Sequence, residues 1–168
     1  MLVMVLVGCS VAPPYFDIGS QIHQGGPVAA GETVYVGVAF LRSQEGDSVE
    51  LRSLELVDPV LGAADVEALV VDMREVDGDA IGTVAASDPR TSAEAIAALA
   101  PLEGFRFTAA ESWHPISIVT AITSTEAGDV SFEAIRIGFS VNGGPAQIQE
   151  IQSGVRMCFG NPLPEGCG

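Results

Sequence analysis

The sequence predicts an all-β fold, an antiparallel β-sandwich with one short helix. Its 168 residues suit a single domain with one core. Nearly half of them (48%) are apolar but only 6% are aromatic, so small branched side chains would fill that core. Short stretches of alternating apolar and polar residues are separated by turn-forming Gly, Asn and Asp-Pro, which indicates seven to eight strands.

The first strands are expected at residues 33–41, 48–57 and 66–74, followed by a short apolar segment at 80–84. Within 48–57 the apolar residues change phase, since Val49 and Leu51 fall on one face and Leu54 and Leu56 on the other. A one-residue bulge near Arg52-Ser53 would bring all four to the core. In 33–41 a regular alternation places one set of side chains on a single face: Val34, Val36, Val38 and Phe40.

The helix is expected just after residue 91. Thr91 and Glu94 have the spacing of a capping box, Ile96 and Leu99 follow at helical spacing, and Pro101 ends the run. The pattern predicts a short surface helix.

The second half of the chain predicts further strands around Phe105 and Phe107, at 115–124, at 130–141 and from about 146 to 157. Within 115–124 one face would hold Ile116, Ile118, Thr120 and Ile122. Within 130–141 Phe132 is out of phase with Ile135 and the apolar residues after it, which predicts a second bulge. Asn142-Gly143-Gly144 is a hairpin turn, because Asn and Gly tolerate the positive φ that tight turns require.

In strand count and spacing this pattern resembles the immunoglobulin-like domains of bacterial envelope proteins. The resemblance implies an immunoglobulin-like antiparallel β-sandwich. It does not extend to the Cys-Trp-Cys arrangement of antibody domains, because Trp113 has no flanking cysteine pair.

The apolar N-terminal run ends in Leu6-Val7-Gly8-Cys9 and resembles the lipobox of bacterial lipoproteins. The resemblance implies cleavage before Cys9, a lipid on its sulfur, and an extracytoplasmic domain anchored to the bacterial cell membrane. Residues 1–9 would then be a lipoprotein signal, 10–31 a tether, and 32–168 the sandwich domain with a C-terminal disulfide loop. An alternative for part of the tether, around Tyr15 to Ile22, is that it packs against the domain.

The signal is short and has no basic residue, since the first arginine is Arg42. Two explanations stay open for the start of the chain. The true start lies upstream, so that residue 1 is an internal methionine of a longer signal. Alternatively, residues 1–7 are a buried strand of an intracellular domain.

Three cysteines make an odd number, which needs an explanation in a secreted protein. With a lipid on Cys9, the remaining Cys158 and Cys167 would form a disulfide. The segment between them contains two prolines and two glycines, so the chain can turn back on itself. Such a disulfide would contribute roughly 2–3 kcal/mol in the loop-entropy model. The alternative is three free thiols in a cytosolic protein.

The charge excludes nucleic-acid binding. There are 22 acidic residues against seven basic ones, all arginine and scattered along the chain, for a net charge of −15. Phosphate binding normally requires clustered Lys and Arg. The acidity itself is typical of a soluble surface.

Candidate reactive residues are few. Ser112 and His114 lie two residues apart, but the chain has no Gly-x-Ser-x-Gly elbow and Ser-x-His spacing alone is common by chance. Asp77 and Asp79 belong to the densest acidic run, and carboxylates of a tight loop are the ligands that calcium uses. The full twelve-residue loop pattern is missing, and a solvated hairpin turn explains the run equally well. Met157 and Cys158 show no metal-ligand spacing. No catalytic residue, cofactor or metal is therefore expected.

We expect a non-catalytic binding or accessory module of the cell envelope, held at the membrane by the lipid on Cys9 and able to bind an envelope protein. The ligand is not specified by any motif. The alternative is an envelope enzyme or small-molecule-binding lipoprotein whose pocket residues are dispersed in the sequence.

The disulfide can be tested by mass. We expect the purified protein to be lighter by one pair of hydrogen atoms before reduction than after it, because Cys158 and Cys167 are oxidised in an extracytoplasmic compartment. An unchanged mass on reduction would contradict the pairing and favour an intracellular domain.

Overall fold

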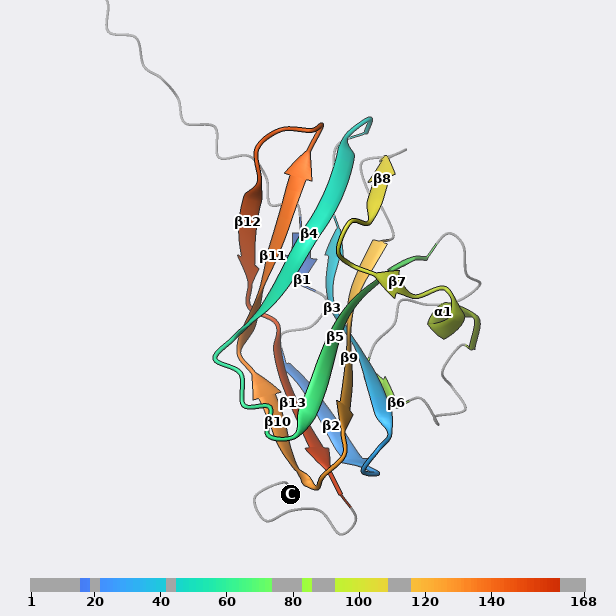
Figure 1. The fold of residues 1–168 in the computed structure, drawn as a ribbon, viewed down its shortest axis with the longest axis vertical. Helices are drawn as coiled ribbons and strands as arrows, with labels where there is room; N and C mark the ends of the chain where they lie inside the picture. Colours follow the sequence, from blue (N-terminus) through green and yellow to red (C-terminus); the bar gives the residue numbers. More distant parts are fainter. Residues whose placement is uncertain are drawn as a thin grey trace, which may run out of the picture.

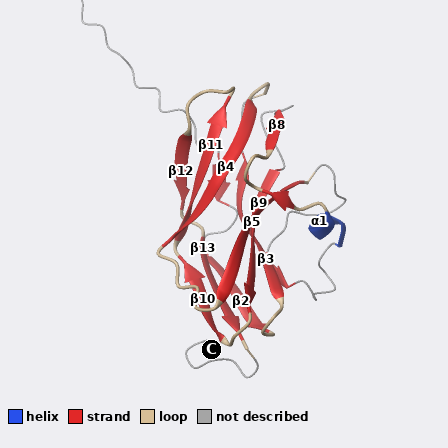
Figure 2. Ribbon diagram, in the orientation of Figure 1, coloured by secondary structure: helices blue, strands red, loops and turns tan. Residues whose placement is uncertain are grey.

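The computed structural model describes residues 16–18, 22–41, 45–73, 83–85, 93–108 and 116–160. These residues form mostly antiparallel β-sheet with one short helix, α1 (Ala93–Ala97), at the side of the molecule (Figure 2). The predicted all-β sandwich is confirmed. Among the described residues there are thirteen strands rather than seven or eight, because long strands are interrupted and short strands form in the connections.

The first sheet has the strand order β1-β3-β9-β5-β7, and β6 also pairs with β3 (Figure 1). All its pairings are antiparallel. Its strands are β1 (Phe16–Ile18), β3 (Thr33–Leu41), β5 (Ala64–Asp72), β6 (Thr83–Ala85), β7 (Ala100–Pro101) and β9 (Ile116–Ser124).

The second layer consists of two smaller sheets, one above the other in Figure 1. One has the order β12-β11-β4-β8 and the other β10-β13-β2, in which β13 and β2 are parallel. The strands are β2 (Ile22–Val28), β4 (Ser48–Val57), β8 (Arg106–Thr108), β10 (Gly128–Phe132), β11 (Ala134–Val141), β12 (Gln147–Ile151) and β13 (Gly154–Phe159).

A single hydrophobic core lies between the two layers. It combines side chains from all three sheets, which would otherwise each expose an apolar face to water. The largest fully buried side chains are Leu41, Leu51, Leu102, Ile116, Ile118, Ile122, Ile135, Ile137, Phe139, Met157 and Phe159.

The predicted bulge in β4 is confirmed. Gly138 pairs with Ser53 and Phe139 pairs with Leu51, so Arg52 is the extra residue. Val49 and Leu51 are fully buried, and Leu54 and Leu56 pack against the same core from their partly buried positions. The side chain of Arg52 is exposed on the opposite face.

The expectation for Phe40 was wrong. The register between β3 and β9 shifts between Gly37 and Ala39, so the alternation changes phase at Val38. Val38, Ala39 and Leu41 enter the core, while Phe40 is only half-buried. A bulge within a run of apolar residues leaves no trace in the sequence pattern.

The second bulge predicted at Phe132 was wrong, because the phase change there is a break between β10 and β11. The chain leaves the ladder at Glu133, whose N–H donates to the carbonyl of Val57 at 3.0 Å. Before the break β10 pairs with β13, and after it β11 pairs with β4 and β12. The hairpin from β11 to β12 is as predicted, since Asn142 and Gly143 both have positive φ (52° and 69°).

Two strands lie within the stretch expected to be a tether, so the predicted start of the domain at residue 32 is too late. Strand β1 pairs with the end of β3, and β2 runs parallel to β13. Sequence alternation did not reveal them because β1 is only three residues long and β2 contains Gly25, Gly26 and Pro27. Both depend on partners distant in sequence.

The long connection from β5 to β9 covers sheet edges. Its short strands pair with β3 (β6), with β5 (β7) and with β4 (β8). An uncovered edge strand offers unpaired N–H and C=O groups to other chains. The connection therefore closes edges of both layers and also contains α1.

Several residues considered above lie outside the described part of the chain: Cys9, Asp77, Asp79, Thr91, Ser112, Trp113, His114 and Cys167. The lipidation site and the disulfide therefore stay predictions. No helix within the described ranges is long and apolar enough to cross a membrane.

One side chain joins the two layers at the first strand. Gln149 of β12 donates from Nε2 to the carbonyl oxygen of Phe16 at 2.8 Å, and the N–H of Phe16 donates to Oε1 of Gln149 at 3.3 Å. The side-chain amide of Gln149 thus bonds to the backbone of β1 as the peptide group of a neighbouring strand would. The ring of Phe16 packs edge-on against Phe139, with centroids 5.0 Å apart.

We expect Gln149→Glu to destabilise the fold by about 1–2 kcal/mol. The ionised carboxylate cannot donate to the Phe16 carbonyl, so that partly buried oxygen loses its partner. The measurement is urea unfolding followed by circular dichroism. Gln147→Glu is the matched control, because Gln147 is exposed on the same strand; equal losses in the two variants would contradict this role of Gln149.

Candidate binding pocket on the first sheet

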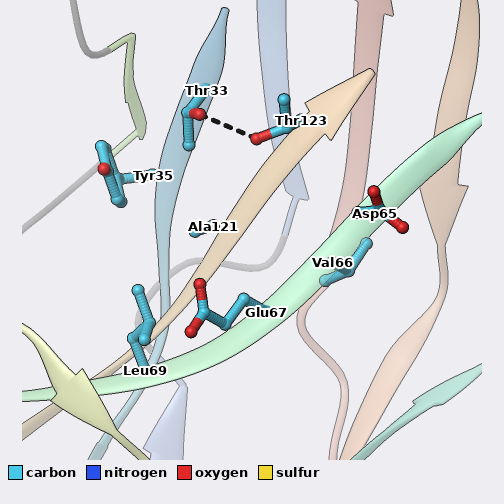
Figure 3. Close-up of a pocket in the computed structure, with 8 residues that line it drawn as sticks. All are labelled: Thr33, Tyr35, Asp65, Val66, Glu67, Leu69, Ala121 and Thr123. Carbon is cyan, nitrogen blue, oxygen red and sulfur yellow. Dashed lines mark hydrogen bonds between the residues drawn. The ribbon is translucent and has the colours of Figure 1, made fainter. Parts of the chain in front are cut away.

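A small pocket lies on the outer face of the first sheet, the face turned away from the core. It has a volume of about 240 Å³. Its lining comes from three neighbouring strands, β3, β9 and β5 (Figure 3). We call it the outer-face pocket; its lining residues are Thr33, Tyr35, Asp65, Val66, Glu67, Leu69, Ala121 and Thr123.

Strand register explains why the surface is hollow there. Ala121 of β9 lies between Tyr35 of β3 and Glu67 of β5, because it pairs with both. A methyl group flanked by two long side chains leaves a depression in a pleated sheet. The next row places Thr123 between Thr33 and Asp65.

The two threonines form one rim of the outer-face pocket. Their Oγ1 atoms are 2.7 Å apart and share a hydrogen bond (Figure 3). This bond ties β3 to β9 near the end of the sheet. Each hydroxyl has further hydrogen-bonding capacity that a ligand could use.

A small apolar layer covers the rest of the same outer face. Ala95 of α1 packs with Leu69, Val71, Val119 and Ala121, and Tyr35 packs against this group. Strand β9 is consequently buried on both faces along most of its length. The outer-face pocket lies where this small apolar layer ends, so the floor of the pocket is apolar and its rim is polar.

The carboxylates of the outer-face pocket are not neutralised. Neither Asp65 nor Glu67 has a hydrogen-bond or ion-pair partner among the described residues. Both side chains are exposed. The pocket is therefore a negatively charged recess with a phenol on one side.

The second layer has the opposite character, because all four described arginines lie on its strands. Arg136 contacts Glu150 at 2.9 Å and Arg156 contacts Asp129 at 3.0 Å. Arg106 contacts Glu50 at 3.0 Å. The fourth, Arg52, is 3.6 Å from Glu50 and donates to Ser140 Oγ at 3.2 Å.

These contacts change the acidity of Glu50. The hydrogen bond from Arg106 is the largest cause that holds the pKa of Glu50 below its usual value, with the charges of Arg106 and Arg52 adding to it and desolvation opposing it. The described arginines thus all form ion pairs with carboxylates of the second layer. On the first sheet, Asp65 and Glu67 have no basic partner among the described residues.

The residues singled out from the sequence do not line the outer-face pocket. Cys158 lies near the end of β13 and is 6% exposed, next to the buried Met157. His23 lies on β2, on the opposite layer. Within the described ranges there is no group of three or more His, Cys, Asp or Glu side chains that could hold a metal ion.

Sequence reasoning missed the outer-face pocket because its residues are contributed by three strands and join only through register. One pattern was available. In β5, Asp65 and Glu67 alternate with Val66 and Ala68, which marks an acidic outer face on that strand. Its neighbours across the sheet could not be assigned from the sequence alone.

Comparisons with known proteins add no family to this description. No protein-family model matches the chain, and neither a curated protein nor a solved structure matches it significantly. Inference about function therefore depends on the residues of this chain.

We expect the pKa of Glu50 to rise toward its ordinary value in Arg106→Gln, because the strongest donor to the carboxylate is removed. Carboxyl carbon NMR across a pH titration measures this directly. In the native protein the pKa is depressed, so the pairing stabilises the fold above the unfolded pKa and is lost as the pH falls through the folded value.

Arg136→Gln is the control for that titration, because Arg136 pairs with Glu150 and not with Glu50. It should leave the titration of Glu50 unchanged. An unchanged pKa of Glu50 in Arg106→Gln would show that Arg106 is not the cause.

Proposed function

We propose that the protein is a lipid-anchored, non-catalytic binding module of the bacterial cell envelope, presenting a β-sandwich outside the cytoplasm. The observation that carries this proposal is the Leu6-Val7-Gly8-Cys9 junction, followed within a few residues by a sandwich domain. The lipid on Cys9 would attach the protein to the membrane. The sandwich would supply a rigid body whose surface binds a partner in the envelope.

We infer further that the sandwich is immunoglobulin-like. Taking interrupted strands together, the main strands in chain order are β1, β3, β4, β5, β9, β10/β11 and β12/β13. The first, second, fifth and fourth form one sheet, β1-β3-β9-β5, and the third, sixth and seventh form the other, β4-β11-β12. This is the ABED and CFG grouping of a seven-stranded immunoglobulin-type sandwich, which supports the inference.

The second candidate is a small-molecule-binding or enzymatic lipoprotein with a dispersed pocket. The outer-face pocket is the feature that favours it, since its lining includes two carboxylates and a phenol. At about 240 Å³ it is smaller than the roughly 300–1,000 Å³ typical of small-molecule sites. A binding module with a small recognition recess agrees better with that size.

We expect labelled palmitate to be incorporated when the full gene product is expressed in a bacterium, because Cys9 would receive the lipid. Cys9→Ser should lose the label and the membrane association together. The double variant Cys158→Ser with Cys167→Ser is the matched control, since it removes the other two cysteines of the chain and keeps Cys9. Label that persists in Cys9→Ser would overturn the anchor.

A further inference from the structure

We propose that the outer-face pocket binds the side chain of a lysine or arginine presented by a protein partner. This inference rests on the proposed function, because it names the chemistry of the partner that the binding module would recognise. It is argued from charge, shape and the distribution of arginine over the two layers.

Charge complementarity supplies the first argument. Asp65 and Glu67 lie on the same face of β5 two residues apart, and neither is neutralised by a described residue. On the second layer, every described arginine is within 4 Å of a carboxylate. No described residue thus occupies the pocket carboxylates, which a cation from outside could bind, and a net charge of −15 would attract such a partner at long range.

Shape supplies the second argument. The floor at Ala121 and the side wall at Leu69 are apolar, which suits the methylene stem of a long basic side chain. Tyr35 lies across Ala121 from Glu67, so a cation above the floor would meet an aromatic ring on one side and a carboxylate on the other. The hydroxyls of Thr33 and Thr123 can accept further N–H groups.

Size selects a side chain over a whole organic ligand. A volume of about 240 Å³ is below the usual range for cofactors and metabolites but is sufficient for one extended side chain. Asp65 and Glu67 line the pocket and are exposed, so a residue projecting from a folded partner or a peptide could reach them.

The test is an NMR titration of the full chain with a blocked Gly-Lys-Gly peptide and with the same peptide acetylated on the lysine side chain. Acetylation removes the charge but keeps the stem. We expect the lysine peptide to shift amide signals of β3, β5 and β9 around the pocket, and the acetylated peptide to leave them unchanged. No shift at the pocket with millimolar lysine peptide would overturn the proposal, as would equal shifts with both peptides.

Variants separate the pocket from general attraction to an acidic protein. Asp65→Asn and Glu67→Gln should each weaken peptide binding by roughly two- to fivefold, the range of an exposed ion pair. The control is Glu55→Gln with Asp58→Asn, which removes two exposed carboxylates of β4 and the turn after it. The control is compared with the double variant Asp65→Asn with Glu67→Gln. Equal weakening of peptide binding by the two double variants would overturn the proposal.

The titration is made in solution without a membrane. A negative result therefore rejects the pocket's role while leaving palmitate labelling of Cys9 to decide the anchor. Conversely, loss of the anchor would not alter the peptide shifts.

Discussion

The register between β3, β9 and β5 is the constraint on which the rest of the structure depends. It sends alternate residues of β9 into the core and the others to an outer face that α1 partly covers. A slip by one residue would exchange these two sets and expose isoleucines while burying threonine and alanine in the wrong layer. The same register places Ala121 between Tyr35 and Glu67, so one set of strand pairings forms both the candidate pocket and the core.

Much of this could be predicted from the sequence, where a strand has one buried face and a clear period. Strands β3 and β4 have the expected bounds, and the phase change between Leu51 and Leu54 located the bulge at Arg52. Features that depend on distant partners could not be predicted. Phe40 was placed wrongly because the bulge at Val38 lies among apolar residues, and β1 and β2 were missed because pairing with β3 and β13, and not alternation, makes them strands.

The candidate site illustrates the same limit. Its carboxylates are visible in the sequence as Asp65 and Glu67, yet nothing there places them beside Tyr35 or Ala121, which are about 30 and 55 residues away. The difference between the two layers is equally invisible, because Arg52, Arg106, Arg136 and Arg156 are scattered along the chain. Folding gathers them on one layer and pairs them with acids, whereas Asp65 and Glu67 on the other layer have no arginine partner among the described residues.

The pairing of β1 with β3 also determines how the domain would stand at a membrane. Only six residues separate Cys9 from Phe16, the first residue paired in the sheet. With a lipid on Cys9, Phe16 would therefore lie at most about 25 Å from the lipidated residue. Phe16 pairs with Leu41, at the end of β3, whereas the outer-face pocket begins at Thr33, the other end of the same strand. The domain would therefore be attached to the membrane near one end and would present the pocket near the opposite end. The short tether would keep the pocket within a narrow range of heights above the bilayer. Such a geometry favours partners that are themselves fixed near that height.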